Sequence, residues 1–136
     1  MSNTSELLDR FVTLFNENRL EEGERDYAPD GIAEEVGTNR RMTPAENTAG
    51  AREWREAFPD AQGMITSRIV EGNRGVAEIV WRGTNTGRLM GQPATGRAVT
   101  VRAVAVIETD GSRITRSSHY IDVAGMMAQL GQTTSV

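Results

Sequence analysis

The sequence predicts an α+β domain in which helices come first and an antiparallel sheet follows. Up to Phe58, apolar residues recur at helical spacings or lie between helix start and stop signals. From Gln62 onward, short runs rich in Val, Ile and Thr end at turn residues, as antiparallel strands do. Because the chain has 136 residues, we expect a single domain over residues 1–136 with one core.

The first two helices are expected before Pro29. Asn3 followed by Glu6 is a helix start signal, and the residues after it place one apolar face on a helix. That face consists of Leu7, Leu8, Phe11, Leu14 and Phe15. A short second helix is expected over Glu21–Tyr27, because Pro29 disfavours its continuation, and a strand over Gly31–Val36 follows.

The third helix has the clearest start in the chain. Thr43 can cap it, Pro44 suits its first turn, and Glu46 completes a capping box with Thr43. The helix then runs towards Phe58 and ends before Pro59. Trp54 lies on its apolar side.

Four strands and a last helix complete the chain. The strands are expected over Met64–Val70, Val76–Thr84, Val99–Ile107 and Arg113–Ile121. The third is apolar except for Thr100 and Arg102, so we expect it to be buried on both faces. A helix over Val123–Leu130 is closed by Gly131, and residues 131–136 are expected to form a flexible tail.

The composition excludes several kinds of chemistry. The chain has no cysteine, which excludes disulfides, thiolate metal sites and cysteine nucleophiles. All fifteen basic residues are arginine, so Schiff-base chemistry on lysine and the phosphate-binding lysine of Walker loops are excluded. One histidine and scattered carboxylates predict no metal site. With a net charge of -4 and dispersed arginines, neither nucleic acid nor a membrane is an expected partner, and we expect a cytoplasmic protein.

Several short motifs, in this order, resemble the SnoaL-like polyketide cyclase family of the nuclear transport factor 2-like superfamily. They are AFPD at 57–60, WRGTNTG at 81–87, MGQPATGR at 90–97, DGSRI at 110–114, and Asp122 before a helix that ends in QLG. The resemblance covers nearly the whole chain and implies a cone-shaped α+β barrel. In that fold a curved antiparallel sheet wraps around N-terminal helices and encloses one apolar cavity.

The resemblance also implies an activity. It suggests a cofactor-free enzyme of secondary metabolism that closes a ring of an aromatic polyketide by an acid/base-catalysed intramolecular aldol reaction, working as a homodimer or higher oligomer. Some relatives hydroxylate polyketides, so a cofactor-independent hydroxylase is the alternative. A third reading is a non-catalytic module that binds a small hydrophobic ligand, because this fold hosts many functions.

Asp122 and His119 are the expected catalytic residues. In the family's cyclases an aspartate that matches Asp122 acts as the acid or base, and the same residue is well placed to cap the last helix. His119 is the only histidine. Its offset of three residues from Asp122 puts the two side chains on opposite faces of an extended strand, so a direct pair needs a bulge near Tyr120.

The expected substrate-binding residues are drawn from several segments. Arg102 interrupts an apolar strand, and two readings stay open: an ion pair with Glu34, Glu35 or Glu78, or a cavity-facing cation that binds an anionic group of the substrate. Members of the family often carry histidine where this chain has Asn85, and also in the region of Glu34 and Glu35. Asn85 and Glu34 are therefore expected substrate-binding residues as well. Aromatic walls for a planar ligand come from Phe15, Trp54 and Trp81.

Overall fold

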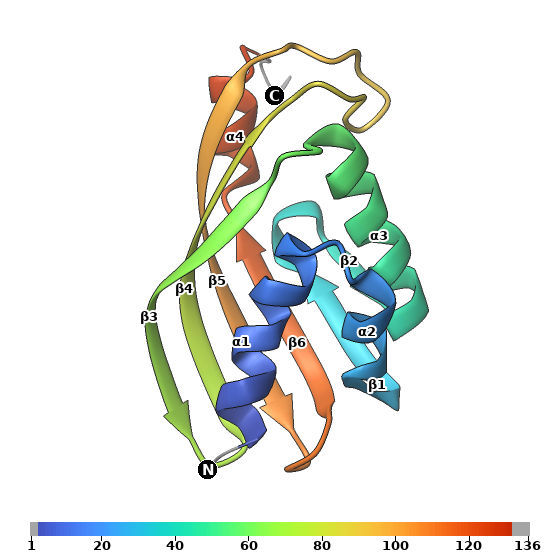
Figure 1. Ribbon diagram of the computed structural model, residues 1–136, viewed down its shortest axis with the longest axis vertical. Helices are drawn as coiled ribbons and strands as arrows, with labels where there is room; N and C mark the ends of the chain where they lie inside the picture. Colours follow the sequence, from blue (N-terminus) through green and yellow to red (C-terminus); the bar gives the residue numbers. More distant parts are fainter. Residues whose placement is uncertain (1–2, 132–136) are drawn as a thin grey trace.

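The computed structural model describes residues 3–131, in which three helices cover one face of a curved six-stranded sheet (Figure 1). The elements follow in the order α1 (Asn3–Asn16), α2 (Leu20–Arg25), β1 (Tyr27–Glu35), η1 (Val36–Thr38), β2 (Arg40–Met42), α3 (Pro44–Ala57), β3 (Gln62–Glu71), β4 (Arg74–Thr84), β5 (Ala98–Thr109), β6 (Ile114–Ile121) and α4 (Val123–Gln129). The predicted α+β class is confirmed. Within residues 3–131, no helix has both the length and the apolar character needed to cross a bilayer.

The sheet is open and mixed. Its strand order is β2-β1-β6-β5-β4-β3, and every neighbouring pair is antiparallel except β1 with β6. The expectation of an entirely antiparallel sheet is therefore wrong at this pair. β1 enters the sheet beside the last strand and runs in the same direction, which places Glu35 opposite His119.

The N-terminal half differs from the prediction in two places. α2 ends at Arg25 and not at Tyr27, because the Tyr27 side chain is buried and starts β1. The short elements η1 and β2 were not predicted, since three residues each are too few for a periodic pattern. The capping box of α3 is confirmed: the Thr43 hydroxyl accepts from Glu46 N at 3.2 Å, and Thr43 N donates to Glu46 Oε1 at 2.9 Å.

The four predicted strands from Gln62 onward are confirmed, but β5 is not buried on both faces. Val101, Ala103 and Ala105 face α1 and the core, whereas Thr100 and Arg102 are exposed on the outer face. The helices cover only the concave face of the sheet. Successive residues of β5 therefore alternate between buried and exposed, as expected for a sheet with one covered face.

The last helix is found where the sequence predicts it. α4 begins after Asp122 and packs against β5, and Gly131 follows it with a left-handed φ of 74°. Apart from Gly131, the expected flexible tail lies outside the described residues. Two clusters form the core, one beneath α1 and one towards α4, and Trp81 and Ile121 pack against both.

Candidate functional site

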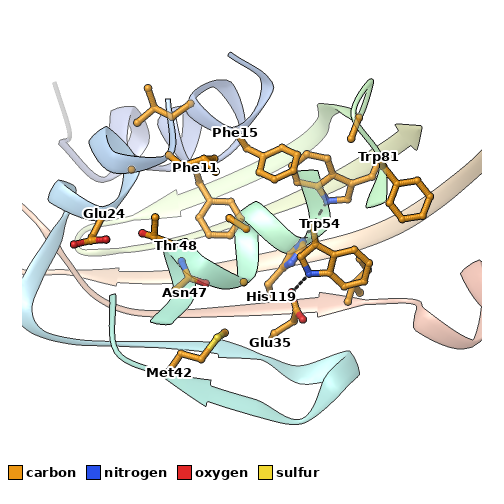
Figure 2. A pocket seen from close by; sticks show the side chains of 18 of the residues that line it. Phe11, Phe15, Glu24, Glu35, Met42, Asn47, Thr48, Trp54, Trp81 and His119 are labelled. Carbon is orange, nitrogen blue, oxygen red and sulfur yellow. Dashed lines mark hydrogen bonds between the residues drawn. The ribbon is translucent and has the colours of Figure 1, made fainter. Parts of the chain in front are cut away.

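A cavity of about 170 Å³ lies between the concave face of the sheet and the helices α1 and α3. Its most prominent walls are aromatic, and Figure 2 shows them gathered around one space. They are Phe11, Phe15, Trp54 and Trp81. A cavity with such walls suits a planar, largely apolar ligand.

Among the ionisable side chains that line the cavity, Glu35 from β1 and His119 from β6 lie beside the aromatic walls (Figure 2). They are direct partners in the parallel pairing of the two strands. Because adjacent strands lie about 4.8 Å apart, the two side chains reach the cavity side by side. The cavity thus holds a carboxylate and an imidazole at one place on its wall.

The imidazole of His119 is held by aromatic neighbours. Trp81 Nε1 donates a hydrogen bond to His119 Nε2 at 3.2 Å, and the Phe11 ring meets the imidazole edge-on with 5.6 Å between centroids. Burial among these rings disfavours the charged form and lowers the pKa of His119 from 6.5 to about 4. At neutral pH the imidazole is therefore neutral.

The carboxylate of Glu35 is held by two donors. Trp54 Nε1 donates to Glu35 Oε2 at 2.8 Å, and the Thr38 hydroxyl donates to Oε1 at 2.7 Å. The side chain is buried, with 9% of its surface exposed. Each oxygen retains a further lone pair, so the carboxylate can still accept a proton from a ligand.

The position of Trp81 depends on the glycine opposite it. Gly63 pairs with Trp81 across β3 and β4, and a Cβ at Gly63 would lie 2.5 Å from Cζ3 of the indole. Phe15 packs edge-on against the same indole, at 5.2 Å between centroids. Together these contacts hold the indole against His119.

Of the four arginines that line the cavity, three are paired with carboxylates, whereas Arg82 of β4 has no salt-bridge partner among residues 3–131. Arg10 Nε lies 2.7 Å from Asp26, Arg19 Nη1 lies 2.6 Å from Glu17, and Arg40 Nη1 lies 3.6 Å from Glu53. Their charges are balanced outside the aromatic space. Most of the positive charge at the rim is therefore neutralised by neighbouring carboxylates.

Four of the predicted site residues line the cavity, namely Phe15, Trp54, Trp81 and His119. The other four, Asp122, Arg102, Asn85 and Glu34, are not among the residues that line it. Each of them has another place in the structure.

Asp122 caps α4. Its Oδ1 accepts a hydrogen bond from Gly125 N at 2.9 Å, and the residue is exposed. Asp122 lies three residues after His119 and just beyond the end of β6, so it is not on the face of the sheet that His119 shares with Ile121. A catalytic role for Asp122 stays a prediction from the sequence.

Arg102 and Glu34 both project from the face of the sheet opposite to the cavity. Arg102 is exposed and pairs across the sheet with Val80, so the expectation that it is a buried cation is wrong. Glu34 binds Arg116 Nη2 at 2.6 Å and accepts from the Ser118 hydroxyl at 3.1 Å. These two contacts lower the pKa of Glu34, the Ser118 hydrogen bond contributing most.

Asn85 is fully buried, but its amide holds the loop between β4 and β5. The side chain donates to Gly87 O at 2.8 Å and Ala57 O at 3.3 Å, and it accepts from Thr95 N at 2.9 Å. This network uses both the nitrogen and the oxygen of the amide. Asn85 therefore ties the loop to the end of α3.

The main residue that the sequence analysis missed is Glu35. Ala33 is buried at 1% exposure, and strand alternation from Ala33 leads to Glu35. Ile32 and Val36, the large apolar residues nearest to it, lie an odd number of positions from Glu35 and so do not mark its face of the strand as the inner one. Val36 begins η1 and is 42% exposed. Among residues 3–131, no group of three or more His, Asp or Glu side chains lies close enough to hold a metal ion.

Known proteins with the same architecture are similar to this chain. The family model of the SnoaL-like polyketide cyclases matches residues 5–130. No curated protein matches the chain. Among solved structures, AclR from Streptomyces galilaeus, a candidate hydroxylase, is 21% identical, with a TM-score of 0.85 over 98% of this chain and 84% of that one.

Two further solved structures are similar over nearly their full lengths. IdmH from Streptomyces antibioticus, a candidate polyketide cyclase, is 24% identical, with a TM-score of 0.84 over 94% of this chain and 98% of that one. A candidate polyketide cyclase from Acidithiobacillus ferrooxidans is 25% identical, with a TM-score of 0.78 over 98% of both chains. By its match over residues 5–130, the chain belongs to the SnoaL-like polyketide cyclase family.

Proposed function

We propose that this protein closes a ring of an aromatic polyketide by an intramolecular aldol reaction, with Glu35 as the general base. The observation that carries the proposal is the Glu35 carboxylate in an aromatic cavity, next to a neutral imidazole. A base in such a site is shielded from water, which strengthens its interaction with a reacting group. The family membership supports the substrate class.

The aldol reaction requires the protein to supply only proton transfers, because the C–C bond forms between two carbons of the substrate. Glu35 removes a proton from a carbon next to a carbonyl group, and the electron pair of that C–H bond forms an enolate. The enolate carbon attacks a second carbonyl carbon of the same molecule, a C–C bond forms, and the C=O π pair moves onto oxygen. The protonated Glu35 then returns its proton to this alkoxide. No electrons are gained or lost overall.

The aromatic walls supply the second part of the catalysis. Phe15, Trp54 and Trp81 can stack on the planar part of a polyketide and hold its flexible part folded. Bringing the two reacting carbons together in advance removes much of the entropy cost of ring closure. The aromatic walls therefore hold the substrate in a reactive conformation, whereas Glu35 removes its proton.

The test compares Glu35→Gln with Glu34→Gln on a synthetic aromatic poly-β-ketone. Both variants replace one carboxylate of β1 by an amide, but only Glu35 lines the cavity. We expect Glu35→Gln to lower kcat by at least about a hundredfold, because a general base is lost. Glu34→Gln should retain a near wild-type kcat. Equal rates for the two variants would exclude Glu35 as the base.

A hydroxylase is the second candidate, since the fold is shared with AclR, a candidate hydroxylase. Oxygen separates the two reactions. Aldol closure proceeds without oxygen and leaves the product with the mass of the substrate, or with that mass less one water. Hydroxylation stops under nitrogen and adds one oxygen atom. A non-catalytic binding module would bind the polyketide and release it unchanged in wild type and Glu35→Gln alike.

A further inference from the structure

The two ring nitrogens of His119 have different surroundings. Nε2 accepts the hydrogen bond from Trp81 Nε1 at 3.2 Å. An indole N–H can only donate, so Nε2 carries the lone pair in this contact. A neutral imidazole has one proton, which therefore resides on Nδ1.

The Nδ1 atom makes no contact of this kind: it has no hydrogen-bond partner among residues 3–131. It is not sealed inside the protein either, because Arg55 Nε is the only fully buried side-chain nitrogen or oxygen without a partner in this part of the chain. Since the ring of His119 lines the cavity, the Nδ1 proton is available to a ligand there.

We infer that Trp81 is a positioning residue: its indole N–H occupies Nε2 of His119, places the imidazole proton on Nδ1, and so makes His119 a hydrogen-bond donor for a carbonyl oxygen of the ligand. The inference extends the proposed function, on which its choice of ligand rests. It assigns the cavity an oxygen-binding subsite next to the base.

The geometry around Trp81 prevents the other tautomer from replacing this one easily. A proton on Nε2 would face the indole proton, and the hydrogen bond would be lost. The indole has little room to move away from His119. Gly63 lies against the indole, and the Phe15 ring packs on the indole at 5.2 Å between centroids. The tautomer is thus fixed by the packing of β3, β4 and α1.

This subsite complements Glu35. When Glu35 removes a proton next to a carbonyl group, negative charge develops on the carbonyl oxygen. A hydrogen bond from Nδ1 would stabilise this oxygen, and a fixed donor needs no reorganisation during the reaction. His119 keeps its proton throughout, so the proton balance of the aldol reaction is unchanged.

The single histidine of the chain makes a direct measurement possible. In protein labelled with ¹⁵N-histidine, two-bond NMR correlations distinguish a proton on Nδ1 from one on Nε2. We expect the Nδ1–H form in the wild type at neutral pH. In Trp81→Phe we expect a shift towards Nε2–H. Trp54→Phe is the matched control, because it removes the indole N–H bound to Glu35 and leaves the one bound to His119.

A pair of probes tests the subsite in the wild type without a variant. 2-Acetylnaphthalene carries a carbonyl oxygen, and 2-ethylnaphthalene has nearly the same shape without it. We expect the ketone to bind about fivefold more tightly and to shift the Nδ1 proton resonance downfield. This preference should shrink in Trp81→Phe and persist in Trp54→Phe.

The outcomes separate this inference from the proposed function. A wild-type proton on Nε2, or an imidazolium at neutral pH, overturns the inference even if Trp81→Phe fails to fold. An unchanged tautomer in a folded Trp81→Phe overturns the role of Trp81, and equal affinities for the two probes overturn the subsite. Full activity of Glu35→Gln would refute the proposed base and leave the tautomer result standing.

Discussion

Glu35 and His119 are opposite each other on β1 and β6, the only parallel pair of strands within residues 3–131, and both side chains line the cavity. The pairing joins the first strand in the sequence to the last one. Trp81 comes from β4, in the antiparallel part of the sheet, and its indole contacts His119. The candidate site therefore depends on the one place where the sheet departs from the predicted topology.

Substitutions of Asp122 separate capping from catalysis. Asp122→Asn keeps an oxygen that can accept from Gly125 N, so we expect almost unchanged stability and a turnover close to wild type. Asp122→Ala removes the cap and should lower the free energy of unfolding by about 1 kcal/mol. Urea unfolding and turnover of the same preparations provide the measurement. Loss of turnover in a stable Asp122→Asn would instead favour the catalytic role that the family resemblance implies.

Asn85 is expected to matter for stability and not directly for chemistry. Asn85→Ala leaves two half-buried groups, Thr95 N and the carbonyl of Gly87, without their partner and removes a side chain that is fully buried. Unpaired buried groups are costly, so we expect a loss of about 2 to 4 kcal/mol in the free energy of unfolding. Thermal and urea unfolding would measure it. A histidine here would not reproduce both the donor and the acceptor contacts of the amide.

The pH dependence of stability should contain a contribution from His119. Its pKa is about 4 in the folded protein and 6.5 in its ordinary environment, so the unfolded chain takes up the proton first as the pH falls. Stability due to this group is complete above pH 6.5 and is lost progressively down to pH 4, by an amount on the order of 3 kcal/mol.

His119→Gln isolates this contribution. The glutamine oxygen can still accept from Trp81 Nε1, but it does not titrate. Carboxylates with lowered pKa values, such as Glu34 and Asp60, titrate in both proteins and cancel in the difference. We expect the wild type to lose stability relative to His119→Gln between pH 6.5 and 4. Parallel unfolding curves over this range would show that His119 is not buried as a neutral group.

The sequence predicts most of the fold because its signals are local. The capping box at Thr43 predicts α3, and the alternating runs predict β3 to β6. These patterns can be recognised without knowing which elements pack against them. The parallel pairing of β1 depends on long-range packing, which no local pattern encodes. The same limit applies to the site: Glu35 and His119 lie far apart in the sequence, and only the pairing of β1 with β6 brings them together.

The half-buried Trp81 offers the most specific test of how the cavity is built. Asn16 holds Gly63 from α1: its amide donates to Gly63 O at 2.9 Å and accepts from Gly63 N at 2.7 Å. The backbone of Gly63 thus has little freedom to retreat from Trp81. A Cβ in Gly63→Ala, 2.5 Å from Cζ3 of the indole, must displace the ring.

We expect Gly63→Ala to lower the free energy of unfolding by about 1 to 3 kcal/mol through overpacking, and to loosen the Trp81 contact with His119. Gly23→Ala is the matched control for stability, because a Cβ there has no neighbour within 4 Å and Gly23 lies in α2. That variant should gain about 0.5 to 1 kcal/mol. Urea unfolding tests both, and the ¹⁵N spectrum of His119 tests the contact. An unchanged spectrum and unchanged stability in Gly63→Ala would mean that the indole has another position open to it.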